Sequence, residues 1–123
     1  MTAAKMAAQR PDPVGLVLDL AGSTSARNAW IEVDLDALAG NVAALHSRTG
    51  PGVEVIAVVK ANAYGHGASA LAPRLEAMGV ARLGVAWVSE AVALRRAGAL
   101  GPVIVLGHSF PEDAATAIEN DIT

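Results

Sequence analysis

Cysteine is absent from this chain of 123 residues. Its absence excludes disulfide bonds, thiolate catalysis and every metal site built on cysteine ligands, and it is compatible with a reducing cytoplasm. Aromatic residues are also scarce, at 3% of the chain with one tyrosine and one phenylalanine. The three histidines, His46, His66 and His108, are spread too widely along the chain to form a metal site. We therefore expect no metal.

Long apolar runs and basic clusters are lacking as well. The longest stretch without a charged residue, 97–111, is interrupted by glycine and proline, whereas a membrane-spanning helix needs about 20 mostly apolar residues. The nine basic residues are scattered and the net charge is −3. We therefore expect neither a membrane span nor a nucleic-acid surface. Residues 1–28, rich in Ala, Pro, Gly and Ser, are expected to form a poorly ordered leader or extension.

What the chain has in abundance is aliphatic residues, since 53% of it is hydrophobic and wholesale disorder is excluded. Alternation of apolar and acidic residues over 30–35 predicts a half-buried strand, and helical spacing predicts a helix over 36–48 that stops at the Gly-Pro-Gly of 50–52. Aliphatic runs predict buried strands, the first of them buried on both faces, at 53–59, 82–87 and 103–106. A Gly-rich loop is expected at 62–67, and further helices at 71–78, 89–96 and 111–118.

This alternation of strand and helix is typical of an α/β fold with parallel strands and crossover helices. Two architectures fit it, namely an open doubly wound sheet and part of a (β/α)8 barrel. A complete barrel needs about 200–250 residues. Three strand–helix units cannot close one.

Lys60 is the residue most suggestive of chemistry, because it ends the first aliphatic strand. Parallel α/β folds place their sites at this end of the strands. An amine held against aliphatic walls loses solvation of its cationic form, which lowers its pKa and lets it attack an aldehyde to form a Schiff base. Gly65 and Gly67 permit a positive φ or a close backbone approach. The ordinary alternative is a lysine that extends into solvent beside a plain turn.

The other polar residues have ordinary interpretations. We expect Glu90 to support the N-terminus of its helix electrostatically. His66 either assists a phosphate or makes loop hydrogen bonds. His108 is expected in a solvated loop, and His46 on the exposed side of its helix.

Residues 57–67 read Ala-Val-Val-Lys-Ala-Asn-Ala-Tyr-Gly-His-Gly. This segment resembles the cofactor-lysine signature of alanine racemases, which use pyridoxal 5′-phosphate. Residues 30–42, 84–95 and 102–107 resemble neighbouring parts of the same family in a single register, so the likeness extends over about 30–120. It implies that residues 29–123 are the first part of an N-terminal TIM-barrel domain, a partial (β/α)8 barrel of the first three to four βα units. Residues 1–28 have no recognised counterpart.

The resemblance also implies a function. Alanine racemases interconvert L- and D-alanine through a pyridoxal-phosphate aldimine and supply peptidoglycan precursors in the cytoplasm. Lys60 would be the catalytic and cofactor-anchoring residue, Tyr64 would bind the cofactor phosphate, and Val58 and Leu106 would pack near the ring. The full-length protein would add a C-terminal, mostly-β domain and form a head-to-tail homodimer.

One part of that chemistry is missing from the chain. Racemisation needs protons on both faces of Cα, and in the family the second base is a tyrosine of the partner subunit's C-terminal domain. Tyr64 is the only tyrosine here. We therefore expect a truncated, inactive piece of the racemase. Three alternatives stay open: a non-catalytic pyridoxal-phosphate-binding or regulatory barrel, another amino-acid racemase such as a serine racemase, and a structural remnant.

Overall fold

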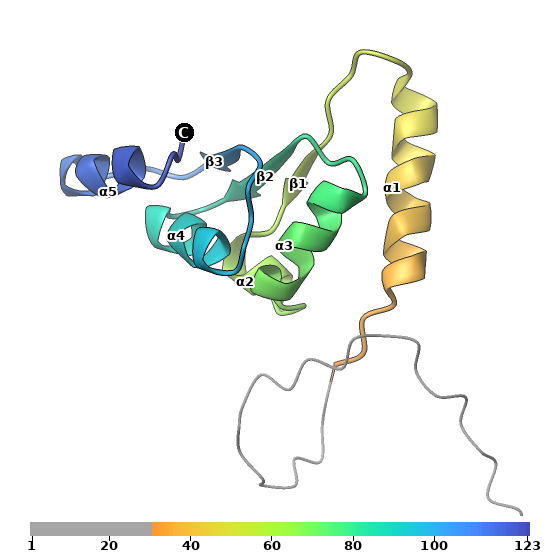
Figure 1. Ribbon diagram of the computed structural model, residues 1–123, viewed down its shortest axis with the longest axis horizontal. Coiled ribbons are helices and arrows are strands. Elements are labelled where there is room, and N and C mark those ends of the chain that lie inside the picture. The colour runs from red at the N-terminus through yellow and green to blue at the C-terminus, as the bar shows by residue number, and fades with distance from the viewer. Residues whose placement is uncertain (1–30) are drawn as a thin grey trace, which may run out of the picture. The chain divides into compact units, whose positions relative to one another are not determined.

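The computed structural model describes residues 31–123, shown in colour in Figure 1. The leader expected at 1–28 and Trp30 lie outside the described residues. The chain divides into two compact units, and all the helices and strands below belong to the unit formed by residues 34–123. No helix among the described residues has the length and apolar character needed to span a membrane.

Helix α1 (Leu35–Thr49) confirms the helix predicted over 36–48. The Asp34 side chain caps it by accepting hydrogen bonds at 2.9 Å from the backbone N–H groups of Asp36 and Ala37. Gly50 ends it with a φ of 80°. The strand predicted at 30–35 is wrong where it can be judged, because residues 31–34 have no regular secondary structure and Leu35 is already helical. Asp34, one of the alternating acids, is the N-cap of α1.

The sheet has three parallel strands in the order β1-β2-β3. Its strands are β1 (Ile56–Val58), β2 (Arg82–Val85) and β3 (Val103–Val105). The helices that connect them are α2 (Lys60–Tyr64) and α3 (Ala68–Ala77) after β1, and α4 (Val88–Arg96) after β2. Parallel strands with helical crossovers are thus confirmed. The strand order β1-β2-β3 does not reverse within these three strands, which is the order of consecutive strands in a (β/α)8 barrel and is consistent with a partial barrel.

The two faces of the sheet differ in burial. One cross-strand row, Ala57–Leu83–Val103, lies on the face that the helices cover, and Leu83 and Val103 have no exposed surface. The adjacent row, which contains Val58, lies on the open face, where Val58 is 40% exposed. The expectation that the first strand is buried on both faces is therefore wrong for β1 among the described residues. Its second face meets no packed layer there.

The core lies between the sheet and the pair of helices α3 and α4, drawn in green and cyan in Figure 1. Leu71 and Leu75 of α3 are buried, as their spacing predicts, and Leu94 of α4 is 1% exposed. Burial of a leucine side chain stabilises a fold by about 1.5–3 kcal/mol. These two helices therefore hold the carboxyl ends of β1 and β2 in fixed relative positions.

The last described residues extend the sheet. After η1 (Pro111–Asp113) and α5 (Ala114–Glu119), Ile122 pairs with Val103 in a parallel bridge. Thr123 donates its N–H to the Val103 carbonyl at 2.9 Å and accepts from the Val105 N–H at 2.7 Å. Residues 122–123 thus occupy the position of a fourth parallel strand beside β3.

Candidate functional site

Lys60 is followed by a left-handed turn. Ala61, Asn62 and Ala63 have φ values of 49°, 56° and 53° with ψ values between 46° and 48°, and Tyr64 has a φ of 53°. Left-handed backbone costs about 1–2 kcal/mol for each non-glycine residue, so a run of four needs support from its surroundings. The loop expected at 62–67 therefore begins with an ordered turn.

Glycine completes the turn as expected. Gly65 and Gly67 have φ values of 90° and 92°, a region that glycine enters without a steric penalty. The Gly67 N–H donates to the Asn62 carbonyl at 2.9 Å, and the Ala68 N–H donates to Asn62 Oδ1 at 2.8 Å. The Asn62 side chain therefore joins the left-handed turn to the start of α3.

Backbone hydrogen bonds tie the turn to the sheet. The Val59 N–H donates to the Gly84 carbonyl of β2 at 2.8 Å, and the Ala63 N–H donates to the Val59 carbonyl at 2.8 Å. Val59 itself is 4% exposed. Lys60 thus starts from a buried, hydrogen-bonded strand end.

Glu90 makes a further connection to this segment. Its Oε1 accepts a hydrogen bond at 2.7 Å from the Ala61 N–H, and its Oε2 accepts from the N–H groups of Ala86 at 2.8 Å and Trp87 at 3.3 Å. The bonds to Ala86 and Trp87 confirm the expected role at the start of α4. The bond to Ala61 was not predicted, because no local sequence signal connects residues 29 positions apart.

The four residues assigned to the cofactor by resemblance lie as follows. Lys60 is exposed and is separated from the end of β1 by Val59, and Tyr64 is 60% exposed at the end of the left-handed turn. Val58 and Leu106 are 40% and 51% exposed. Leu106 follows β3, so these residues belong to the carboxyl edge of the sheet. The described residues do not enclose Lys60 with the aliphatic walls that the sequence predicts.

Val58 and Leu106 share the open face of the sheet. Val58 pairs with Gly84, and a Cβ placed on Gly84 would lie 2.9 Å from Leu106 Cδ1. Leu106 therefore lies over Gly84, the residue of β2 that pairs with Val58. An apolar surface adjoins the strand end that carries Lys60.

The histidines play separate roles. His66 Nδ1 lies 2.9 Å from the Ala63 carbonyl oxygen, which is a loop hydrogen bond. His108 is exposed as expected, with its ring edge-on to Phe110 at a centroid distance of 5.1 Å. The expectation for His46 is wrong, since its Nε2 is buried and has no hydrogen-bond partner among the described residues. Residues 31–123 contain no group of three or more potential metal ligands.

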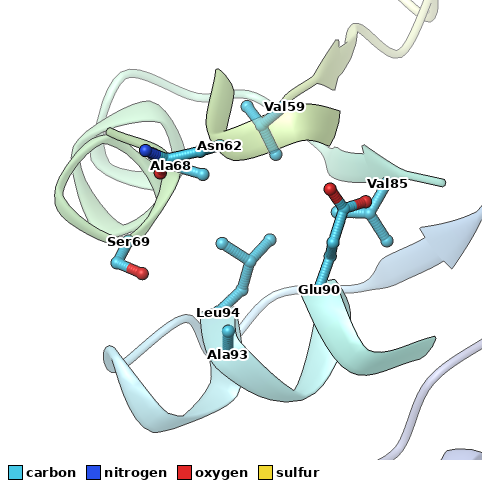
Figure 2. Close-up of a pocket in the computed structure, with 8 residues that line it drawn as sticks. All are labelled: Val59, Asn62, Ala68, Ser69, Val85, Glu90, Ala93 and Leu94. Atoms are coloured by element: carbon cyan, nitrogen blue, oxygen red, sulfur yellow. Dashed lines mark hydrogen bonds between the residues drawn. The ribbon is translucent and has the colours of Figure 1, made fainter. Parts of the chain in front are cut away.

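A pocket of about 210 Å³ lies behind the left-handed turn, between α3 and α4 (Figure 2). Its lining comprises Val59, Asn62, Ala68, Ser69, Val85, Glu90, Ala93 and Leu94. None of the four residues assigned to the cofactor lines it. Figure 2 shows the Glu90 carboxylate lying between Val59 and Val85 at the side of this pocket.

Comparison with known proteins gives a consistent family. Residues 33–123 match the family model described as "Alanine racemase, N-terminal domain". Alanine racemase from Geobacillus kaustophilus is 49% identical over 96 residues, which are 78% of this chain and 25% of the relative. Alanine racemase 1 from Bacillus subtilis is 43% identical over 97 residues, 79% of this chain and 25% of the relative. The chain thus spans about a quarter of the length of these curated relatives.

Solved structures agree with the sequence comparison. The crystal structure of alanine racemase from Bacillus anthracis with bound L-Ala-P superposes with a TM-score of 0.71 at 47% identity, covering 73% of this chain and 23% of that one. Alanine racemase from Corynebacterium glutamicum gives a TM-score of 0.67 at 40% identity, with 73% and 26% covered. The family model, the relatives and the partial barrel together establish that this chain belongs to the alanine racemase family, through its N-terminal domain.

Proposed function

We propose that this chain supplies the cofactor lysine of an alanine racemase, a pyridoxal-phosphate enzyme that interconverts L- and D-alanine. The observation that carries the proposal is the position of Lys60, at the carboxyl end of β1 and the start of an ordered left-handed turn, inside the region that matches the family. We place the reaction in the cytoplasm, where D-alanine serves peptidoglycan precursor synthesis.

The residues at the carboxyl edge suit pyridoxal phosphate chemically. Lys60 offers a primary amine for an aldehyde, and the Tyr64 hydroxyl offers a donor for a phosphate. Val58 and Leu106 offer apolar contacts for a ring, and all four side chains are accessible. The donor set therefore fits an aldehyde, a phosphate and an aromatic ring.

Each residue then has a defined task. Pyridoxal phosphate supplies an electron sink that weakens the bond between Cα and its hydrogen in an attached amino acid. Lys60 Nζ would hold the cofactor and would also carry a proton to or from one face of Cα. Tyr64 keeps the phosphate end in place. We further propose a homodimer in which a tyrosine of the partner subunit's C-terminal domain would serve the opposite face, since Tyr64, the one tyrosine of these 123 residues, is assigned to the phosphate.

Covalent trapping tests the lysine. We would load the full-length protein that carries this chain with pyridoxal phosphate, reduce it with borohydride and map the labelled peptide. We expect the label on Lys60, and no label on this segment in a Lys60→Ala variant. Lys5 is the only other lysine in the chain and provides an internal control. A label on Lys5, or none on Lys60, contradicts the assignment.

A chiral assay tests the reaction and its substrate. We expect D-alanine to form from L-alanine, and the activity to be lost in Lys60→Ala. Faster conversion of L-serine than of L-alanine would indicate a different amino-acid racemase. A label on Lys60 without any D-amino acid would instead indicate a non-catalytic cofactor-binding barrel.

A further inference from the structure

We infer that Glu90 is a positioning residue for Lys60, which it controls through the peptide group that joins Lys60 to Ala61. The inference rests on the proposed function of Lys60 and extends it to a residue on a different helix. Glu90 lies on α4, after the second strand, whereas Lys60 follows the first.

Lys60 is bracketed by two hydrogen bonds to neighbouring structure. On its N-terminal side, the carbonyl of the peptide that joins Val59 to Lys60 accepts from the Ala63 N–H at 2.8 Å. On its C-terminal side, the Ala61 N–H donates to Glu90 Oε1 at 2.7 Å. Because the peptide groups on both sides are held, φ and ψ of Lys60 are fixed, and with them the direction in which its side chain leaves the strand end.

A helix-capping role alone does not account for this geometry. Capping of α4 requires Glu90 to accept from the start of its own helix, and Oε2 does so through Ala86 and Trp87. Oε1 is then free to accept from another segment, and it accepts from Ala61. One carboxylate therefore joins the ends of β1 and β2.

The left-handed conformation after Lys60 depends on the hydrogen bond between Ala61 and Glu90. Ala61 is the first of four consecutive left-handed residues, three of which are neither glycine nor asparagine. Such residues prefer other backbone conformations, because their Cβ crowds the following carbonyl oxygen. Hydrogen bonds to a charged acceptor are roughly twice as strong as neutral ones, so the carboxylate opposes relaxation of the turn.

The space around the carboxylate allows that relaxation when the carboxylate is removed. The pocket of about 210 Å³ behind the turn is lined by Glu90 together with Asn62 of the turn itself (Figure 2). A shorter side chain at position 90 would enlarge this space. Replacing Glu90 with alanine therefore leaves open space beside Asn62 of the turn, which favours its relaxation.

Glu76 provides a matched control. Its carboxylate also accepts two backbone hydrogen bonds from a loop, from the N–H groups of Leu100 at 3.1 Å and Gly101 at 3.0 Å. Those residues precede β3, at the opposite edge of the sheet from Lys60. Removing Glu76 therefore removes similar bonds without touching the lysine segment.

The experiment compares Glu90→Ala and Glu90→Gln with Glu76→Ala and Glu76→Gln in the full-length protein. The first readout is amide hydrogen exchange of Ala61 in the cofactor-free protein, with thermal unfolding measured in parallel. The second is the apparent Kd for pyridoxal phosphate, with borohydride trapping at Lys60. Glu90→Gln keeps one acceptor oxygen and a similar volume, so it decides the matter if Glu90→Ala does not fold.

We expect Ala61 exchange to accelerate and the apparent Kd to rise, each by about tenfold in Glu90→Ala and by less in Glu90→Gln. In the Glu76 variants, the Ala61 exchange rate and the apparent Kd should both stay within about a factor of two of wild type. This should hold even if their unfolding temperature falls as much as that of the Glu90 variants. Unchanged Ala61 exchange or an unchanged Kd in the Glu90 variants overturns the inference. Absence of any label on Lys60 in the wild-type protein instead overturns the proposed function, which makes the two failures distinguishable.

Discussion

Leu106 lies across Gly84, so that a Cβ on Gly84 would be 2.9 Å from Leu106 Cδ1 and 3.5 Å from Ile56 Cγ2. Gly84 occupies the middle strand, where any side chain would project into the open face of the sheet. The missing side chain lets Leu106 cover β2 and approach the row that contains Val58. A glycine in a strand often marks such a close approach.

Gly84→Ala should displace Leu106 while leaving the fold almost intact. The clash falls on the far end of a flexible side chain that is 51% exposed, so Leu106 can rotate away. We expect a change in unfolding free energy below about 1 kcal/mol. The apparent Kd for pyridoxal phosphate should rise by about threefold to tenfold, because the proposed apolar contact between Leu106 and the ring would be disturbed. An unchanged Kd would show that Leu106 does not contact the cofactor.

Gly107→Ala should behave in the opposite way, as a loss of stability. A Cβ at this position would collide with the backbone carbonyl oxygen of Ala86, which cannot rotate aside. We expect the substitution to lower the unfolding free energy by about 1–3 kcal/mol, measured by denaturant titration.

Gly40→Ala is the control for that substitution. A Cβ at Gly40 meets no atom within 4 Å, and the residue lies inside α1. Alanine there should raise the unfolding free energy by about 0.5–1 kcal/mol. Equal effects of the two substitutions would contradict the close approach of Gly107 to Ala86, the residue after β2.

Periodicity sufficed for much of the fold. The apolar spacing of α3 and the aliphatic runs of β2 and β3 reflect burial against one layer, which a single sequence records directly. The error at residues 31–34 arose because Asp34 and Asp36 alternate with apolar residues in a helix start as they would in a strand. The aliphatic run of β1 predicts burial on both faces, but β1 is an edge strand and no described layer packs on its second face.

The details of the candidate site were beyond sequence reasoning for a different reason. Of residues 61–64 only Asn62 is of a type that often adopts left-handed backbone, and it does so as a single residue, so the sequence does not predict a run of four. The conformation depends on contacts made after the chain has folded, including the bond between Ala61 and Glu90. Lys60 could be predicted as a candidate because its position at a strand end and its resemblance to the family signature are both local.

Arg95 should be essential for the start of the fourth strand. Its guanidinium donates hydrogen bonds to the carbonyl oxygens of Ala99, Gly101, Asn120 and Asp121, at distances from 2.6 to 3.1 Å. Lysine cannot reproduce this planar set of donors. We expect Arg95→Lys to lower the unfolding free energy by about 1.5–3 kcal/mol.

Hydrogen exchange locates that effect. The Val105 N–H donates to the Thr123 carbonyl, so its exchange should accelerate in Arg95→Lys if residues 120–121 lose their attachment. The exposed neighbour Arg96 serves as the control, and Arg96→Lys should change the unfolding free energy by less than about 0.5 kcal/mol. Normal protection of Val105 in Arg95→Lys would show that the bridge to β3 forms without the guanidinium.

Tyr64→Phe should separate phosphate binding from Schiff-base chemistry. Tyr64 is 60% exposed, so loss of its hydroxyl should change the unfolding temperature little. We expect the apparent Kd for pyridoxal phosphate to rise by about tenfold, because one hydrogen bond to a charged group is removed. The apparent Kd for pyridoxal, which carries no phosphate, should change by less than about twofold, because Lys60 still provides the amine. Equal losses for the two aldehydes would assign Tyr64 to the ring or the lysine instead of the phosphate.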